Sequence, residues 1–276
     1  MQHAATTSGD VTLRPLSRVV GAEVLGLDLS QPIRPETAEL LRDAYRRHHL
    51  LLVRGQQPTT TQQSAFAEVF GNIVLREKNE VKNAEDKAQH VSNVRDDGLF
   101  GMGDLDFHLD QLFQPQPLSA LILCALEVPS KGGDTLFVNA MAAVEKMPAA
   151  LRDRIKDLNC LNAYTFAGNL AKDWNVKDAS GHGMTQEHPM LWQDPLSGRH
   201  ALWVNKLTTL GVVGLAAEES AALIAEVRRY LYDESITYQH KWRVGDLLLW
   251  DNLRLQHART PFDAAERRTL RRTPIL

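Results

Sequence analysis

Residues 246–275 read DLLLWDNLRLQHARTPFDAAERRTLRRTPI, and this stretch is the most informative about the fold class. Short apolar runs at Asp246–Asp251 and Arg268–Ile275 predict two strands, and His257 lies between them. Other strand-like runs precede and follow inserted helices, without the regular alternation that a Rossmann fold or a TIM barrel requires. The sequence therefore predicts a mainly β fold, an antiparallel barrel or sandwich with added helices.

The other elements are predicted from hydrophobic periodicity, capping residues and turn residues. Further strands are expected at Val11–Leu13, Arg18–Leu25, Leu50–Val53, Phe107–Phe113, Ala120–Val128, Asp134–Val138, Met190–Gln193, Ala201–Asn205 and Ile236–Trp242. Helices are expected at Pro35–His49, Thr59–Phe70, Ala140–Leu158 (one or two helices) and Ala216–Tyr232.

The composition is that of an ordinary globular protein, with 276 residues, 43% hydrophobic and 24% charged. No repeat, low-complexity tract or proline-rich linker divides the chain, so we expect a single domain over residues 1–276. Residues 1–10 are expected to be disordered. Residues 76–106 contain scattered lysines and glycines and are expected to form an active-site lid loop.

Charge and cysteine content exclude several classes of protein. The formal net charge of −3 provides no basic field for nucleic acid. Apolar runs such as Leu118–Leu126 are too short to cross a bilayer, and Met1–Asp10 shows no secretory signal. Cys124 and Cys160 cannot build a disulfide framework. We therefore expect a cytoplasmic protein that binds neither nucleic acid nor membrane.

The triplet His108-Leu109-Asp110 is the first candidate for chemistry. Alternate residues of a strand face the same side, so His108 and Asp110 are expected to point into one cavity. An imidazole and a carboxylate form two thirds of the facial triad of non-haem Fe(II) oxygenases, and His257 is the best candidate for the third ligand. By itself, such a triplet arises often by chance, and a lone histidine is usually a core or surface residue.

Arginines in the last predicted strand form the second candidate. Arg268, Leu270 and Arg272 share one face, and Thr269, Arg271 and Thr273 share the other. Arginines on an inward face are costly unless each meets an anion, and a guanidinium grips a carboxylate through two parallel hydrogen bonds. The alternative is a solvated basic edge, and the nearby histidines and aspartate favour the anion site.

These segments resemble the taurine dioxygenase-like (TauD/TfdA) family of Fe(II)/2-oxoglutarate-dependent dioxygenases. The matching residues follow one another along the chain: Phe107–Asp110, Gly132–Thr135, His188-Pro189, Ser197–Arg199, Val204-Asn205, Gly245–Asn252, His257, Arg268 and Arg272. The resemblance implies a double-stranded β-helix (jelly-roll) core with flanking α-helices. Relatives are commonly dimers or tetramers, so a homo-oligomer is expected.

The resemblance also implies a role for each matching residue. His108, Asp110 and His257 would bind Fe(II), with 2-oxoglutarate and O2 as co-substrates. Thr135 and Arg268 would hold the distal carboxylate of 2-oxoglutarate. Two further arginines match positions that contact an acidic substrate in some relatives: Arg272 and, through a looser alignment, Arg76.

The chain departs from the family pattern around the first metal ligand. The family usually has Trp before this histidine and Ser or Thr between the two ligands, where this chain has Phe107 and Leu109. Phe107 is expected to keep an aromatic wall, and Leu109 to point away from the metal. Trp250-Asp251-Asn252 is expected to be scaffold and to support the metal ligands rather than to take part in catalysis. The carboxylate of Asp110 favours hydroxylation over halogenation, because a glycine there would open a position for a halide. Release of a leaving group, desaturation and cyclisation stay open, and the match at Arg272 implies a small acidic substrate.

Two other functions fit parts of the pattern. A metal-dependent hydrolase on a β-barrel could use the same triad for zinc, with Glu127 or Glu187 as base. The predicted clamp of Thr135 and Arg268 argues against it, because hydrolysis needs no keto acid. A non-catalytic binding barrel is the third interpretation, and the intact set of ligands argues against that one.

Overall fold

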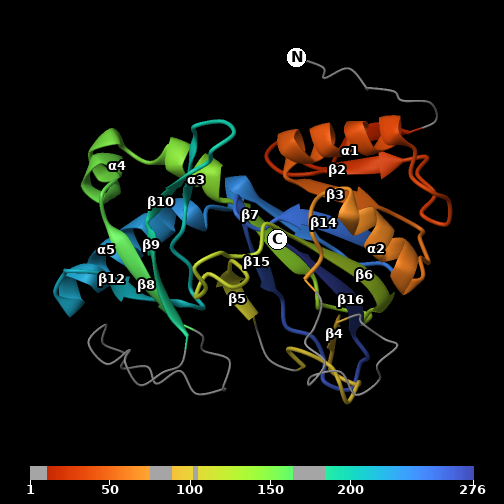
Figure 1. Cartoon of the computed structure of the whole chain (residues 1–276). Coiled ribbons are helices and arrows are strands. Elements are labelled where there is room, and N and C mark those ends of the chain that lie inside the picture. Colours follow the sequence, from red (N-terminus) through yellow and green to blue (C-terminus); the bar gives the residue numbers. More distant parts are fainter. Residues whose placement is uncertain (1–10, 75–88, 102–104, 164–183) are drawn as a thin grey trace.

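The computed structural model describes residues 11–74, 89–101, 105–163 and 184–276. The fold is mainly β, as predicted, with a jelly-roll core formed by two facing sheets and helices on the outside (Figure 1). Neither sheet closes into a barrel. Among the described residues, no helix is both long and apolar enough to cross a membrane.

The larger sheet has seven strands in the order β1-β2-β3-β14-β6-β16-β4. In chain order they are β1 (Thr12–Pro15), β2 (Ala22–Leu25), β3 (Leu50–Val53), β4 (Gln89–Ser92), β6 (Ala120–Glu127), β14 (Leu247–Asp251) and β16 (Thr269–Ile275). Its centre is apolar on both faces because both faces are covered.

The facing sheet has four strands in the order β13-β7-β15-β5. Their bounds are β5 (Leu105–His108), β7 (Thr135–Asn139), β13 (Thr237–His240) and β15 (Leu255–Arg259). Side chains from both sheets form one apolar cluster between them, including Leu121 of β6, Trp250 of β14 and Phe137 of β7. The candidate site lies at one end of this cluster.

Helices α1 (Pro35–His48) and α2 (Thr60–Glu68) cover the outer face of the larger sheet (Figure 1). Thr59 caps α2 through the predicted capping box with Gln62. Side chains on the same strand alternate between the two apolar layers, as Leu51 contacts this helical layer and Leu52 the inner cluster.

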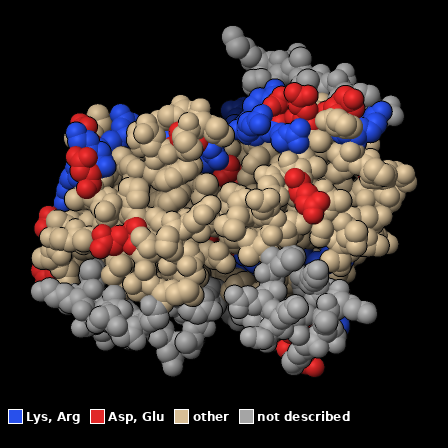
Figure 2. Space-filling view, in the orientation of Figure 1, with Lys and Arg blue, Asp and Glu red and all other residues tan. Residues whose placement is uncertain are grey.

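A second lobe covers the four-stranded sheet (Figure 1). It contains α3 (Ala140–Lys146), α4 (Ala149–Ile155), α5 (Ala217–Leu231), the three-stranded sheet β12-β8-β9 and the hairpin β10-β11. The bounds of these strands are β8 (Asn159–Ala163), β9 (Thr185–Pro189), β10 (Leu191–Gln193), β11 (His200–Leu202) and β12 (Thr209–Val212), and a 3-10 turn spans Glu234–Ile236. On the face shown in Figure 2, acidic and basic side chains are intermixed over α1.

The structure corrects several predicted elements. The strand expected at Phe107–Phe113 ends at His108, and Arg18–Leu25 is a strand only from Ala22. Strand β15, which carries His257, was not predicted. Within the expected lid loop, β4 is instead a strand paired with β16. Residues 1–10, and residues 76–88 and 102–104 of the expected lid, lie outside the described part of the chain.

Candidate active site

His108 and Asp110 lie close together, but not for the predicted reason. His108 is the last residue of β5, and Asp110 lies in the turn that follows, where Gln111 has a φ of 61°. Asn252 fixes this turn: the Asp110 N–H donates to its Oδ1 (2.8 Å), and its Nδ2 donates to the Asp110 carbonyl oxygen (3.0 Å). A turn clamped by Asn252 therefore brings the carboxylate back toward His108.

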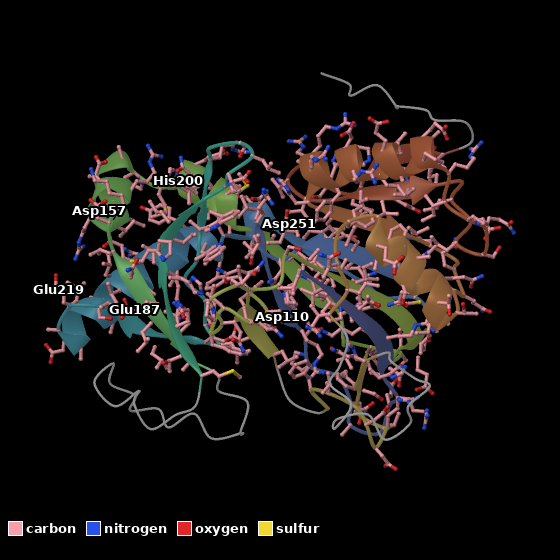
Figure 3. The ribbon with its side chains drawn as sticks, in the orientation of Figure 1. Asp110, Asp157, Glu187, His200, Glu219 and Asp251 are labelled. Carbon is pink, nitrogen blue, oxygen red and sulfur yellow. The ribbon has the colours of Figure 1, made fainter. Side chains whose placement is uncertain are left out.

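His257 joins them through strand pairing, since it lies directly opposite His108 in the antiparallel pair β15–β5. Directly opposed residues project from the same face of a sheet. Asp110 Oδ1 lies 3.1 Å from His108 Nε2 and 3.8 Å from His257 Nε2. The donor atoms of the three residues lie within 4.8 Å of one another. Figure 3 labels Asp110, which lies beside the end of β5.

The protonation states suit a divalent metal. Burial alone would raise the pKa of Asp110, but Arg272 and the two histidines hold it well below its usual range, so the carboxylate is charged. Burial, together with His108, lowers the pKa of His257 to about 3, so its imidazole is neutral at pH 7. His108 Nδ1 donates to the Asp106 carbonyl oxygen (2.8 Å), which leaves Nε2 free to bind a metal. Two imidazoles and one carboxylate fit Fe(II).

The three residues line a pocket that contains about 450 Å³ of empty space, part of it open to solvent. Its other lining residues are Val91, Phe100, Leu105, Leu121, Leu123, Thr135, Trp250, Ala258, Arg259, Arg268 and Arg272. Both predicted 2-oxoglutarate residues, Thr135 and Arg268, are therefore at the pocket together with the triad.

Arg268 is buried without a carboxylate partner. Its side chain is anchored by one hydrogen bond, from Nε to the Gly133 carbonyl oxygen (2.9 Å), and it forms no ion pair with any described residue. Burial, reinforced by the nearby positive charge of Arg259, lowers its pKa to about 9. A buried guanidinium of this kind is stabilised by an anionic ligand.

Arg272 extends toward the triad. Its Nη2 donates to Asp110 Oδ2 (2.5 Å), and its Nη1 donates to Gln89 Oε1. Arg271 points the other way and donates to Gln63 Oε1 (2.8 Å). The predicted division of the two faces of β16 is thus confirmed, and the alternative of a solvated basic edge is wrong for these buried residues.

Some site residues were missed and others were misplaced. Arg259 lines the pocket and was missed. Trp250 also lines it and contacts the His257 ring, with centroids 4.9 Å apart, as expected of a residue that supports a ligand. Once β15 is recognised, the spacing of His257 and Arg259 would have predicted that both face inward. Phe107 forms no wall of the pocket and instead stacks on Tyr232 in the core, while Leu109 points away as expected. Arg76 lies outside the described residues.

The proposed hydrolase bases do not line the pocket. Glu127 pairs with Arg267 (2.6 Å) at the surface. Glu187 is an exposed residue of β9 in the second lobe, well apart from Asp110 in Figure 3. Neither carboxylate can activate a water at the triad, so the structure gives no support to a hydrolase.

Known proteins share both the sequence pattern and the fold. Residues 12–273 match the family model "Taurine catabolism dioxygenase TauD, TfdA family". The alpha-ketoglutarate-dependent 2,4-dichlorophenoxyacetate dioxygenase of Cupriavidus pinatubonensis is 30% identical, over 96% of this chain and 98% of its own. Pentalenolactone F synthase of Streptomyces avermitilis is 28% identical, over 95% of this chain and 92% of its own.

Solved structures agree. A taurine dioxygenase from Burkholderia xenovorans superposes with a TM-score of 0.82 at 26% identity, covering 97% of this chain and 89% of its own. The structure of AAD-2 with Mn(II) and N-oxalylglycine, a 2-oxoglutarate analogue, gives a TM-score of 0.80 at 25% identity and covers 96% of both chains. The chain therefore belongs to the TauD/TfdA family and is an Fe(II)- and 2-oxoglutarate-dependent dioxygenase.

Proposed function

We propose that this dioxygenase hydroxylates a C–H bond of a small organic acid and converts 2-oxoglutarate to succinate and CO2. In this proposal His108, Asp110 and His257 bind the iron, and Thr135 and Arg268 bind the distal carboxylate of 2-oxoglutarate. Arg272 contacts the acidic group of the primary substrate, and Arg76 is a second candidate for that contact.

The charge of the pocket is the observation that supports an acidic substrate. Among the described residues that line it, Arg268 and Arg272 face the single carboxylate of Asp110, and Arg268 forms no ion pair with any described residue. A divalent metal and the dianion of 2-oxoglutarate cancel each other in charge. The positive surplus therefore remains and favours an anionic primary substrate.

The residues of the chain contribute placement and exclusion of water. When bound, iron with 2-oxoglutarate and O2 supplies the oxidising chemistry that breaks the C–H bond. Arg272 holds one oxygen of Asp110 and leaves the other facing the two histidines. Leu121, Leu123 and Trp250 make the adjoining wall apolar, which excludes water from the reacting atoms.

An acidic substrate can reach Arg272 without breaking its contact to Asp110. Its Nη1 donates to the neutral amide oxygen of Gln89, and a carboxylate or sulfonate is a stronger acceptor than an amide. The acid would then replace Gln89 as the partner. The acidic substrate named for the Cupriavidus relative, 2,4-dichlorophenoxyacetate, agrees with this choice.

Succinate formation triggered by candidate substrates tests the proposal. The panel pairs carboxylic acids, sulfonates and sulfate esters with uncharged amides and alcohols of the same carbon skeleton. We expect acids to trigger succinate release, with a hydroxylated product in equal amount, and Arg272→Ala to raise the KM for the acid. Equal stimulation by the uncharged partners would contradict an acidic substrate.

Three broader expectations stay predictions: a single domain, a homo-oligomer and a cytoplasmic location. Sedimentation of the purified protein tests the second, because a dimer or tetramer is two or four times the 30.9 kDa mass of one chain.

A further inference from the structure

Trp242 forms a directional hydrogen bond to the co-substrate pocket. Its indole N–H donates to Thr135 Oγ1 over 2.9 Å, and both side chains are buried. Trp242 follows β13, which pairs with β7 so that His240 lies opposite Thr135. Thr135 in turn lies opposite Arg259 of β15. The register of three strands therefore fixes the place of this pair beside the pocket.

The direction of this bond constrains the threonine. An indole N–H can only donate, whereas a hydroxyl both donates and accepts. With Oγ1 accepting from Trp242, the hydroxyl proton of Thr135 must point elsewhere. No described residue accepts it. Because Thr135 lines the pocket, a ligand in the pocket is the natural acceptor.

Trp242 itself is held firmly. The His240 ring meets it edge to face, with centroids 4.5 Å apart and planes at 88°. His240 is fully buried, and its Nε2 lies 3.1 Å from an Asp246 oxygen. Arg54 holds the same carboxylate through two hydrogen bonds of 2.9 and 2.8 Å. The indole therefore packs edge to face against a buried ring, which limits its movement.

We propose that Trp242 is a positioning residue that commits the Thr135 hydroxyl to donate into the pocket, beside the Arg268 guanidinium. The Thr135 hydroxyl and the Arg268 guanidinium both donate hydrogen bonds at this place. Together they favour a fully ionised carboxylate at the distal end of the keto acid and disfavour a group that itself donates a hydrogen bond. This inference rests on the proposed role of Thr135 and Arg268 and adds the residue that orients one of them.

Ligand binding without turnover tests the inference. Calorimetric titration of the Mn(II)-loaded protein compares N-oxalylglycine, which carries a distal carboxylate, with oxalate, which chelates metal but has none. We expect Trp242→Phe to weaken N-oxalylglycine about 3- to 10-fold, the value of one hydrogen bond. Oxalate binding should stay unchanged. Equal weakening of both ligands, or of neither, would overturn the proposal.

A double-mutant cycle separates orientation from general damage. Thr135→Val removes the hydroxyl and should weaken N-oxalylglycine about 10-fold, while Thr135→Ser should restore most of it. In the Thr135→Val background, Trp242→Phe should add less than about twofold. An additive effect would show that Trp242 acts by another route.

Further variants serve as controls for these binding measurements. Trp203→Phe also loses a buried indole bond, to the Leu253 carbonyl oxygen, and should leave N-oxalylglycine binding unchanged. If Trp242→Phe does not fold, benzothienylalanine at position 242 replaces the N–H by sulfur at nearly the same shape. An unchanged affinity in Thr135→Val would refute the proposed clamp itself. Weakening by Thr135→Val but not by Trp242→Phe would refute only the role of Trp242.

Discussion

Two arginines that are largely shielded from solvent, Arg254 and Arg268, have opposite surroundings. Arg254 lies between Asp194 and Asp251 and donates hydrogen bonds to both. Burial alone would lower the pKa of Arg254, but these carboxylates raise it. Arg268 has no such partner, and its pKa falls to about 9. Figure 3 labels Asp251 and Asp110, which mark the two regions.

The contrast separates a structural cluster from a binding site. The Arg254 cluster is complete within the chain and joins the second lobe, through Asp194, to the end of β14. In the pocket, the described residues Arg268 and Arg272 face only the carboxylate of Asp110, so one positive charge is left without an opposite charge among them. A buried charge without a partner is costly, so its presence indicates a ligand that supplies the opposite charge.

The largest expected effect is on metal binding in the pocket. His108→Ala or Asp110→Ala removes one of three donors, so we expect loss of Mn(II) binding and of succinate formation. Calorimetry and a succinate assay measure these two quantities. His200→Ala, which changes an exposed histidine of β11, is the matched control and should retain both. Turnover by either pocket variant would contradict the assignment.

A substitution in the Arg254 cluster should affect the stability of the protein and not its ligand binding. Arg254→Met leaves the buried carboxylates of Asp194 and Asp251 without their cation, and we expect a loss of about 3–5 kcal/mol in the free energy of unfolding. Urea denaturation measures it. N-oxalylglycine affinity at a temperature where the variant is folded should be unchanged, and a large drop would join the two regions functionally.

Arg268 in the pocket should show the reverse, a small effect on stability and a large effect on ligand binding. Arg268→Met removes a charge that forms no ion pair with any described residue, so its free energy of unfolding should change by less than about 1 kcal/mol. The affinity for N-oxalylglycine should fall by roughly 2–5 kcal/mol, because a charge-assisted pair is lost. A strongly destabilised variant with intact affinity would assign Arg268 to the scaffold.

The smallest expected effect is a pH dependence at His49, near Asp251. Burial, with Arg254 next, lowers the folded pKa of His49 to about 4 from 6.5. The unfolded chain therefore takes up a proton that the folded protein refuses, and stability falls as the pH drops from about 6.5 to 4. Asn tolerates the φ of 57° at this position. His49→Asn should therefore reduce the stability lost between pH 6.5 and pH 4 by about 1–3 kcal/mol. Parallel slopes in both proteins would exclude His49 as the cause.

The sequence predicted most elements around the site because their residues follow clear local patterns. The apolar runs of β6 and β14, the inward face of β16 and the cap of α2 all follow local periodicity. The turn after β5 was missed because the clamp from Asn252 joins residues far apart in the chain. Strand β15 was missed because its polar residues, Gln256, His257 and Arg259, hide the β pattern.

The sequence also did not predict which charged residues form ion pairs. Periodicity showed that Arg268 and Arg272 share a face, but only tertiary contacts reveal that Arg272 meets Asp110 while Arg268 meets no carboxylate. The prediction that Phe107 forms an aromatic wall of the pocket was wrong because of another tertiary contact. The Phe107 ring stacks on Tyr232 in the core instead.

A crystal structure of the protein with Mn(II) and N-oxalylglycine tests the central claim most directly, with the metal located by its anomalous scattering. We expect Mn(II) bound to His108 Nε2, Asp110 Oδ1 and His257 Nε2, with the distal carboxylate of the analogue on Arg268 and Thr135. A metal bound elsewhere, or an analogue whose distal carboxylate avoids Arg268, would contradict it.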